Sequence, residues 1–221
     1  SIVKDLFTNK IDIYHGLSHE LPLGIEKTSI KSVVTIHDLI FIRYPHLFST
    51  IDRKIYLKKF KSACERADKI IAISQQTKQD IIDFLDIPES KITVVYQGCN
   101  NIFQKPIAES KKEETLKKHN IPTEYLLNVG SIEERKNLLT LLQALKELPN
   151  QKLVVIGNGK SYKIKCLRYI KEHNLSGRVM FLSNLTLEEM AVIYQSAQLM
   201  IYPSIFEGFG IPILESLFSK T

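Results

Sequence analysis

Two glutamates, Glu207 and Glu215, flank a glycine-containing turn near the C-terminus of the chain. The turn, Gly208–Phe209–Gly210, follows an apolar run over residues 197–201 that predicts a buried strand, and precedes a predicted helix over residues 211–219. Glycines let the backbone approach a ligand closely, and the unpaired amides of a helix start attract an anion. Each feature alone is common in helices that bind nothing. Together they predict a crevice in which one ligand touches both carboxylates.

A second pattern for anion binding lies upstream of the first. Gly130 ends a predicted strand, and the basic pair Arg135–Lys136 precedes a predicted helix over residues 138–148. Two cations and the free amides of a helix start would converge on one spot, which is the chemistry of a diphosphate clamp. The alternative is a solvated basic pair in a loop. Proximity to the first motif favours the clamp.

A histidine and an aspartate, His37 and Asp38, end a third predicted strand, over residues 31–36. Parallel α/β sheets bind their ligands at this end of their strands, so both side chains are candidates for a site. A histidine that is satisfied by local hydrogen bonds is the commoner alternative. The residues alone leave both interpretations open.

The elements that must position these residues alternate between strand and helix along the chain, which predicts an α/β fold with parallel sheets flanked by helices. Strands are expected at residues 11–15, 31–36, 69–73, 92–96, 125–129, 152–156, 179–182 and 199–202. Helices are expected at residues 2–9, 53–67, 75–85, 138–148, 162–173, 187–196 and 211–219, with Ser74 as an N-cap. A segment rich in asparagine, glycine and proline, residues 97–109, breaks the alternation. It predicts two domains, residues 1–108 and residues 109–221.

The composition excludes several classes of protein. The net charge is +6, with 15 basic and 12 acidic residues in each half, so no half carries the concentrated charge typical of a nucleic-acid domain. No apolar run approaches a membrane span, and the N-terminus does not resemble a signal peptide. The three cysteines are widely spaced, which argues against zinc and favours a reduced, cytoplasmic setting.

The C-terminal motif resembles the signature of a known enzyme family. Glu207-x7-Glu215 with its Gly-Phe-Gly insert and the preceding Tyr-Pro-Ser is similar to the motif of retaining glycosyltransferases of family 4, and members of the mannosyltransferase-like branch carry a similar His-Asp-Leu. The resemblance implies the GT-B type, with two Rossmann-like domains, an acceptor-side domain followed by a domain that binds a nucleotide-sugar. It also implies roles for the carboxylates: Glu215 binds the ribose hydroxyls, and Glu207 faces the donor sugar together with the amides of Phe209 and Gly210. His37 would position hydroxyls of the donor sugar, and Asp38 would orient His37 or help to hold the acceptor.

The chemistry implied by the resemblance needs neither a metal nor a cofactor. The sequence shows no carboxylate pair suited to a double displacement and no Asp-x-Asp metal motif. It also lacks G-x-G-x-x-G, and residues 109–221 contain no aspartate, which argues against a dinucleotide oxidoreductase. The resemblance implies retention by front-face attack, in which the departing diphosphate takes the proton of the acceptor hydroxyl. Positioning, and charge stabilisation by Arg135, Lys136 and the start of the final helix, would then supply most of the catalysis.

The expected substrates are a nucleotide-sugar donor, with mannose and a guanosine-diphosphate donor as first choice, and a glycan or lipid-linked acceptor of a bacterial surface polysaccharide. A sugar-nucleotide epimerase of the same fold and a non-catalytic nucleotide-sugar binding module are the alternatives. Family members have an earlier strand and a glycine-rich turn that this sequence lacks. We therefore expect a fragment truncated at both ends, with an incomplete N-terminal domain and without the C-terminal end of the second domain.

Two further segments have open interpretations. Gly157–Asn158–Gly159 predicts an ordinary tight turn, or backbone that lines a nucleobase pocket. Lys54, Lys58 and Lys61 lie at helical spacing, opposite an apolar stripe in the predicted helix over residues 53–67. The stripe comprises Tyr56, Leu57, Phe60, Ala63 and Cys64. The lysines predict a solvated face, or else a contact with the anionic cytoplasmic face of a membrane or with a lipid diphosphate acceptor.

Overall fold

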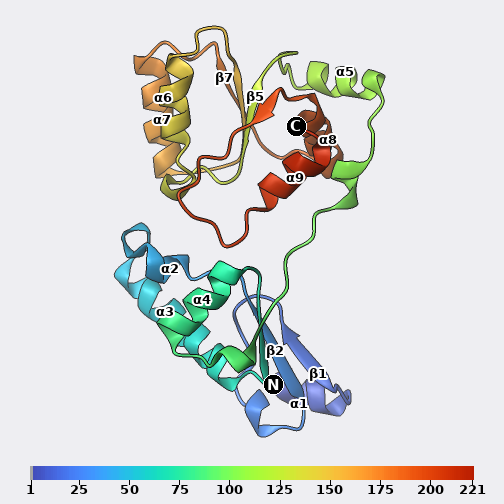
Figure 1. Cartoon of the computed structure of the whole chain (residues 1–221), viewed down its shortest axis with the longest axis vertical. Helices are drawn as coiled ribbons and strands as arrows, with labels where there is room; N and C mark the ends of the chain where they lie inside the picture. Colours follow the sequence, from blue (N-terminus) through green and yellow to red (C-terminus); the bar gives the residue numbers. More distant parts are fainter. Residues whose placement is uncertain (1) are drawn as a thin grey trace. The chain divides into compact units, whose positions relative to one another are not determined.

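The computed structural model describes residues 2–221, which fold into two compact units (Figure 1). The first unit contains the residues up to Gln97 together with Glu207–Phe209, and the second contains Gly98–Phe206 and Gly210–Thr221. Each unit is built on a parallel sheet flanked by helices, so the predicted α/β class is confirmed.

The sheet of the first unit has four parallel strands in the order β1-β2-β3-β4. Its strands are β1 (Ile13–Gly16), β2 (Lys31–Ile36), β3 (Lys69–Ala72) and β4 (Ile92–Val94). Its helices are α1 (Ile2–Thr8), α2 (Ile40–Arg43), α3 (Thr50–Arg66) and α4 (Gln75–Leu85), with 3₁₀ turns η1 (Ile25–Lys27), η2 (Pro45–Leu47) and η3 (Glu89–Lys91). The predicted N-cap Ser74 is confirmed, because its hydroxyl accepts a hydrogen bond from the Thr77 amide at 3.0 Å.

The short helix α2 was not predicted, and an ion pair with a buried carboxylate holds it in place. Arg43 at its C-terminal end pairs with the buried carboxylate of Asp80 on α4. The same carboxylate accepts a hydrogen bond from Gln76 at 2.8 Å. An ionised group that is removed from water needs such partners. Four residues are too few for the sequence pattern to reveal a helix.

The predicted apolar stripe of α3 is correct only toward its C-terminal end. Ala63 and Cys64 are buried against the sheet, whereas Leu57 is 41% exposed. The N-terminal half of α3 packs on α2, where Tyr56 meets Phe41 edge-on at 5.7 Å, and α2 is too short to cover it. Leu57 therefore shares one surface with Lys54, Lys58 and Lys61, and the prediction that these lysines lie opposite the whole stripe is wrong.

The sheet of the second unit is also parallel, with strand order β7-β6-β5-β8. Its strands are β5 (Leu126–Val129), β6 (Leu153–Ile156), β7 (Val179–Leu182) and β8 (Leu199–Met200). Its helices are α5 (Glu109–Lys118), α6 (Leu138–Lys146), α7 (Ser161–Glu172), α8 (Leu187–Ser196) and α9 (Ile211–Ser219), with 3₁₀ turns η4 (Asn101–Gln104) and η5 (Glu134–Lys136).

Helices cover both faces of this second sheet, with α6 and α7 on one side and α8 on the other (Figure 1). Successive residues of β5 point to opposite faces: Leu126 packs with α6 and α7, and Leu127 packs with α8. Burial on both faces explains why β6 is a continuous apolar run rather than an alternating pattern, and why β5 is apolar apart from the buried Asn128.

The predicted buried strand over residues 197–201 is wrong in extent and in burial. Only Leu199 and Met200 form β8, and Leu199 is 52% exposed. The reason is topological, because β8 lies at the edge of the sheet and pairs with β5 alone. Beyond β8 the Ile201 amide still donates to the Leu127 carbonyl at 2.8 Å, so the chain leaves the sheet in a defined direction.

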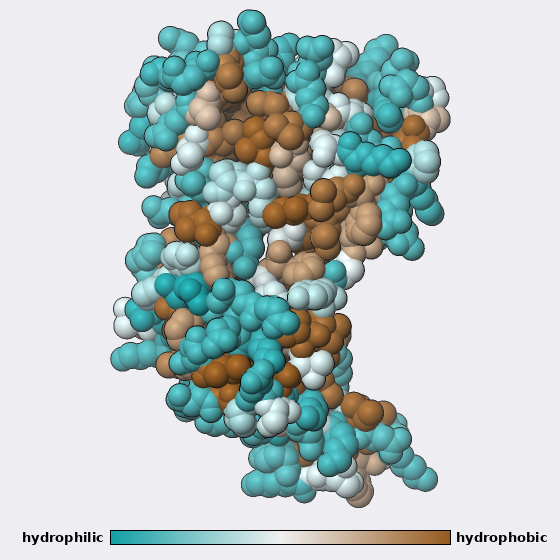
Figure 2. Space-filling model, viewed as in Figure 1, coloured by the Kyte–Doolittle hydropathy of each residue, from teal (hydrophilic) through white to brown (hydrophobic). Residues whose placement is uncertain are grey.

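The cysteines and the exposed apolar side chains bear on the expectations from composition. Cys64 and Cys166 are buried and Cys99 is half-buried, and all three are free thiols. In residues 2–221, no helix has both the length and the apolar character needed to cross a bilayer. Apolar side chains of α9 remain exposed, and Figure 2 shows an apolar patch over this part of the second unit. They are Ile213, Leu217 and Phe218.

Candidate functional site

The predicted site residues lie where parallel strands end, as expected for an α/β fold. In the first unit, His37 and Asp38 directly follow β2. In the second unit, Gly130 follows β5, and the segment 201–210, which joins β8 to α9, carries the C-terminal motif.

His37 is held by a loop that the sequence analysis did not identify. Its Nε2 lies 2.9 Å from the carbonyl oxygen of Leu17. A carbonyl oxygen can only accept, so Nε2 carries a proton, and in the neutral ring Nδ1 is an acceptor. The ring of His19, from the same loop after β1, meets His37 edge-on at 5.2 Å. The sequence signal that could have indicated this loop is His19, a second histidine close to the end of the strand expected at residues 11–15.

Asp38 lies two residues before the short helix α2, whose N-cap is Leu39. Its Oδ1 accepts a hydrogen bond from the Ile40 amide at 3.0 Å, which is the local bond of an Asx turn that leads into the helix. This local role explains the aspartate in structural terms. The predicted roles of Asp38 toward His37 or an acceptor remain predictions.

The second unit brings Lys136 to Gly130 and to the start of segment 201–210. The Lys136 ammonium lies 2.8 Å from the Tyr202 hydroxyl and 5.0 Å from the centre of that ring. A Cβ atom added to Gly130 would lie 3.6 to 3.7 Å from the end of the Lys136 side chain, and Gly130 has a φ of +143°. The positive φ would strain a larger residue at position 130, and the distances are those of ordinary contact with the lysine. Gly130, Lys136 and Tyr202 therefore form one cluster, which we call the lysine cluster.

Arg135 braces the segment that follows Tyr202. Its guanidinium donates to the Phe206 carbonyl oxygen at 2.5 Å and to the Glu133 carboxylate at 2.6 Å. Its own carbonyl oxygen accepts from the Ile205 amide at 2.9 Å. These bonds give Arg135 a structural role beside the lysine cluster. Its role as a phosphate ligand remains a prediction.

The prediction of free amides at the start of α6 is wrong for Leu139. The Leu139 amide donates to the Tyr162 hydroxyl oxygen at 3.0 Å, so a side chain from α7 satisfies it. The N-cap of α9 is Gly210, at φ +95°, and Pro212 occupies the first turn as predicted. Pro212 has no amide hydrogen and the Ile213 amide donates to the Gly210 carbonyl oxygen at 3.0 Å, so the start of α9 also offers an anion fewer amide donors than predicted.

Glu215 lies one turn inside α9 and is half-buried. Its Oε2 accepts a hydrogen bond from the Tyr194 hydroxyl at 2.7 Å. Burial raises the pKa of Glu215 above its usual value, and the bond from Tyr194 opposes that rise. Burial, followed by the charge of Glu215 and the bond to it, raises the pKa of the Tyr194 phenol. Glu215 and the lysine cluster both belong to the second unit.

Residues 207–209 group with the first unit. A Cβ atom added to Gly208 would lie 2.3 Å from the carbonyl oxygen of His37, so the backbone conformation there requires glycine. The ring of Phe209 stacks on Tyr96 with 6.0 Å between centres. Gly208 is thus brought to His37. The expected contacts of Glu207 and Phe209 with a donor sugar remain predictions.

The turn Gly157–Asn158–Gly159 supports the loop of Gly130. The Asn158 carbonyl oxygen accepts from the Ile132 amide at 2.8 Å, and a Cβ atom on Gly157 would lie 1.9 Å from the Gly130 carbonyl oxygen. Position 157 therefore requires glycine. This is the tight-turn interpretation, and nothing in the structure tests whether the turn lines a nucleobase pocket.

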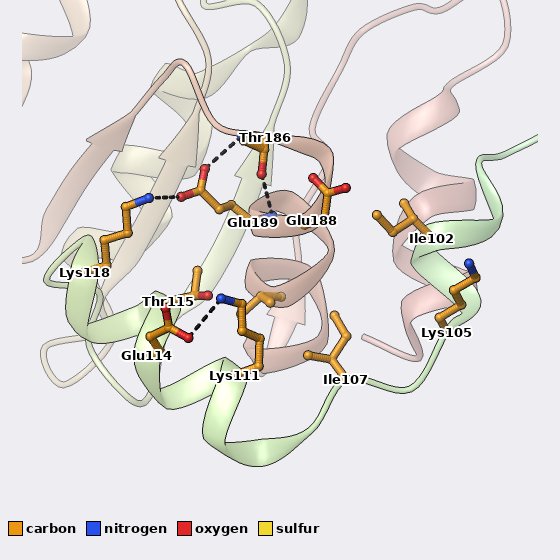
Figure 3. A pocket seen from close by; sticks show the side chains of 11 residues that line it. Ile102, Lys105, Ile107, Lys111, Glu114, Thr115, Lys118, Thr186, Glu188 and Glu189 are labelled. Atoms are coloured by element: carbon orange, nitrogen blue, oxygen red, sulfur yellow. Dashed lines mark hydrogen bonds and ion pairs between the residues drawn. The ribbon is translucent and has the colours of Figure 1, made fainter.

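A cavity of about 620 Å³ lies away from these clusters, between η4, α5 and α8 (Figure 3). Its rim charges are largely paired with each other, with Lys111 2.9 Å from Glu114 and Lys118 2.7 Å from Glu189. None of the predicted site residues lines it.

Comparison with protein-family models matches both halves of the chain. The model of the glycosyl transferases group 1 matches residues 111–221, half of the chain, and the model of Glycosyltransferase Family 4 matches residues 1–101. The lysine cluster and Glu215 fall in the first match, and His37 and Asp38 fall in the second.

Two curated relatives come from Escherichia coli. The serotype-specific mannosyltransferase WbdA is 29% identical over 213 residues, which are 92% of this chain and 26% of that protein. The O-antigen chain mannosyltransferase B is 27% identical over 212 residues, which are 93% of this chain and 54% of that protein. The chain therefore spans between about a quarter and about half of the length of these relatives.

Solved structures share the fold over nearly the whole chain. A glycosyltransferase from Rickettsia africae matches with a TM-score of 0.76 at 20% identity, covering 100% of this chain and 59% of that one. Anabaena Alr3699/HepE, solved in complex with UDP, also matches with a TM-score of 0.76, at 18% identity, covering 99% of this chain and 60% of that one. The chain therefore has the GT-B fold and belongs to the group 1 glycosyl transferases, of the family 4 type.

Proposed function

We propose that this chain is the core of a metal-independent hexosyltransferase, which moves a sugar from a nucleoside diphosphate to a glycan or lipid-linked acceptor with retention of configuration. Residues 109–221 bind the donor, and residues 1–108 form the acceptor side. The observation that carries the proposal is the lysine cluster at the strand ends of the second unit, which also holds Glu215.

The lysine cluster suits a diphosphate. The Lys136 ammonium is fixed by the Tyr202 hydroxyl, and the end of its side chain lies against Gly130. An ion-assisted hydrogen bond of this kind contributes roughly 1.5–3 kcal/mol to binding. In the transfer step the same charge stabilises the diphosphate as it leaves, so binding and catalysis use one group.

The remaining residues position the reactants. His37 offers Nδ1 as an acceptor for a hydroxyl of the donor sugar, because Nε2 is committed to Leu17. Glu207 and the amides of Phe209 and Gly210 face the same sugar. The acceptor hydroxyl attacks the anomeric carbon as its bond to the diphosphate breaks, and the departing diphosphate oxygen takes the hydroxyl proton. No covalent sugar–protein bond forms in this scheme.

The names of the relatives support mannose as the sugar. WbdA and the O-antigen chain mannosyltransferase B are both mannosyltransferases, and Salmonella typhimurium RfbU, at 26% identity, is a third. The Anabaena neighbour holds UDP, which supports a nucleoside diphosphate as the leaving group but not the choice of base. We take GDP-mannose as the first donor to test.

A surface of the first unit supports a peripheral contact with an anionic membrane. On α3, Lys54, Lys58 and Lys61 share one face with exposed Leu57, and Ile51 in the first turn is 71% exposed. Basic and apolar side chains together are the combination that binds an anionic lipid surface. Sedimentation with vesicles tests this contact: binding should require anionic lipid and weaken in high salt. Binding that ignores both would remove it.

A transfer assay on the full-length protein tests the proposed function. GDP-mannose and a lipid-linked glycan acceptor should give an α-mannoside by NMR, at a rate that EDTA leaves unchanged. A β-mannoside would refute retention, and loss of the rate in EDTA that Mg²⁺ restores would refute metal independence. Epimerised donor or free sugar formed without acceptor would identify the epimerase alternative. Donor binding without transfer to any acceptor would identify the binding module.

A further inference from the structure

Tyr194 contacts Glu215, and burial, a ring contact and a hydrogen bond hold its side chain in place. It is fully buried on α8, and its ring meets Phe103 of η4 edge-on at 5.4 Å. Its backbone carbonyl oxygen accepts from the Thr221 hydroxyl at 2.6 Å. The phenol hydroxyl points to Glu215 and donates to Oε2 at 2.7 Å. A hydroxyl buried in this way has little freedom to turn elsewhere.

The bond from Tyr194 engages one oxygen of the Glu215 carboxylate and leaves the other available to a ligand. An ionised carboxylate accepts through both oxygens, and the Tyr194 hydroxyl engages Oε2. Within residues 2–221, Oε1 has no hydrogen-bonding partner, although the side chain is half-buried. Because the bond to Oε2 fixes the orientation of the carboxylate, Oε1 is preorganised to accept a hydrogen bond from a hydroxyl group of a ligand.

We propose that Tyr194 is a positioning residue for donor binding, which orients Glu215 so that its second oxygen accepts from the vicinal hydroxyls of the ribose in a nucleoside diphosphate. The inference rests on the proposed function, because it deepens the donor site of the second unit. The sequence offered no sign of it, since Tyr194 is one of several apolar and aromatic residues on the buried face of α8.

Another tyrosine of the same core supplies a matched control. Tyr125 is also fully buried, packs in the same cluster as Tyr194, and donates its hydroxyl to the Ile193 carbonyl oxygen at 2.6 Å. Replacing either tyrosine with phenylalanine removes one buried hydrogen bond and keeps the ring. Only the Tyr194→Phe variant breaks a bond to Glu215.

The experiment compares ribose with its deoxygenated form. GDP and UDP are titrated calorimetrically into the full-length wild type, and the nucleotide that binds is then compared with its 2′,3′-dideoxy analogue in wild type, Tyr194→Phe and Tyr125→Phe. Tyr194→Phe should weaken binding of the ribonucleotide about fivefold to thirtyfold, the equivalent of one hydrogen bond. It should leave binding of the dideoxy analogue unchanged, and Tyr125→Phe should change neither.

The outcomes separate this inference from the function on which it rests. Equal weakening of both nucleotides by Tyr194→Phe, or no weakening of either, would overturn the inference while leaving nucleotide binding intact. Failure of the wild type to bind any nucleoside diphosphate would instead overturn the proposed function, and the inference with it. In steady-state transfer, Tyr194→Phe should raise the donor KM and leave kcat unchanged, whereas a merely structural loss would lower the active fraction and hence kcat.

Discussion

Replacing Glu189 with glutamine should destabilise the second unit in a way that depends on pH. Glu189 is the third residue of α8, and its side chain is only 14% exposed. Its Oε1 accepts from the Lys118 ammonium at 2.7 Å and lies 2.8 Å from His119 Nε2, while Oε2 accepts from the Thr186 amide at 2.9 Å. Figure 3 shows the bonds to Lys118 and Thr186. The carboxylate thus joins α5 to the capped start of α8.

The size of the effect follows from the pKa of Glu189. The Lys118 bond, followed by the bonds from Thr186 and His119, lowers this pKa from 4.5 to about 2. At about 1.4 kcal/mol per pKa unit, the ionised carboxylate stabilises the fold by about 3 kcal/mol at neutral pH. Because the folded pKa is depressed, this stabilisation is complete above pH 4.5 and is lost as the pH falls toward 2. A glutamine keeps the bond from Thr186, so we expect Glu189→Gln to cost about 2–3 kcal/mol at pH 7.

Urea denaturation followed by circular dichroism measures this difference, since the chain contains no tryptophan for fluorescence. Hydrogen exchange at the α5 and α8 amides then assigns the loss to the second unit. Glu188→Gln is the control, because it removes an exposed carboxylate from the same helix turn and should cost less than about 0.5 kcal/mol. A Glu189→Gln loss below 1 kcal/mol, or a loss that stays constant between pH 7 and pH 3, would refute the reasoning.

Three further substitutions have definite expected outcomes. Gly157→Ala should cost about 3 kcal/mol or more in urea denaturation, because its Cβ would lie 1.9 Å from a backbone oxygen, whereas Gly177→Ala, with open space around it, should cost far less; equal costs would contradict the account of the turn. Asp80→Asn should cost about 3 kcal/mol, since it leaves the Arg43 guanidinium without its ionised partner, and a cost below 1 kcal/mol would contradict an ion pair with a buried carboxylate. Glu215→Gln should raise the Tm at pH 7 and leave it unchanged at pH 3. Burial raises the pKa of Glu215 and so favours its protonated form, which means that the wild type loses stability as the pH rises through that pKa. An unchanged Tm at pH 7 would contradict this reasoning.

The sequence was informative about elements that the core requires. The bounds of β2, α4 and α9 agree with the predicted ranges, because each has a clear apolar pattern and a clear start or end. The sequence was misleading where the tertiary structure determined the extent and the burial of an element. The apolar run at residues 197–201 predicts a buried strand, but the strand order puts β8 at an edge, and strand order is not encoded locally.

The candidate site could be predicted in its residue types but not in its contacts. The glycines, the basic pair and Glu215 were identified from motif and resemblance, and the structure joins Gly130 and Lys136 through Tyr202 in the unit that also holds Glu215. The capping of Leu139 by Tyr162 spans 23 residues, and the bond between Tyr194 and Glu215 spans 21. Residues this far apart in the sequence are brought together by tertiary packing, so no local sequence pattern could predict their contacts.

The central claim is that the lysine cluster binds the diphosphate of a nucleotide, and a calorimetric titration of GDP and UDP tests it most directly. Lys171 on α7 provides a control, since it is an exposed lysine of the same unit outside the cluster. We predict saturable binding of one nucleotide to the wild type, weakened about tenfold or more by Lys136→Ala and unchanged by Lys171→Ala. Equal affinity of the wild type and Lys136→Ala for that nucleotide would contradict the claim.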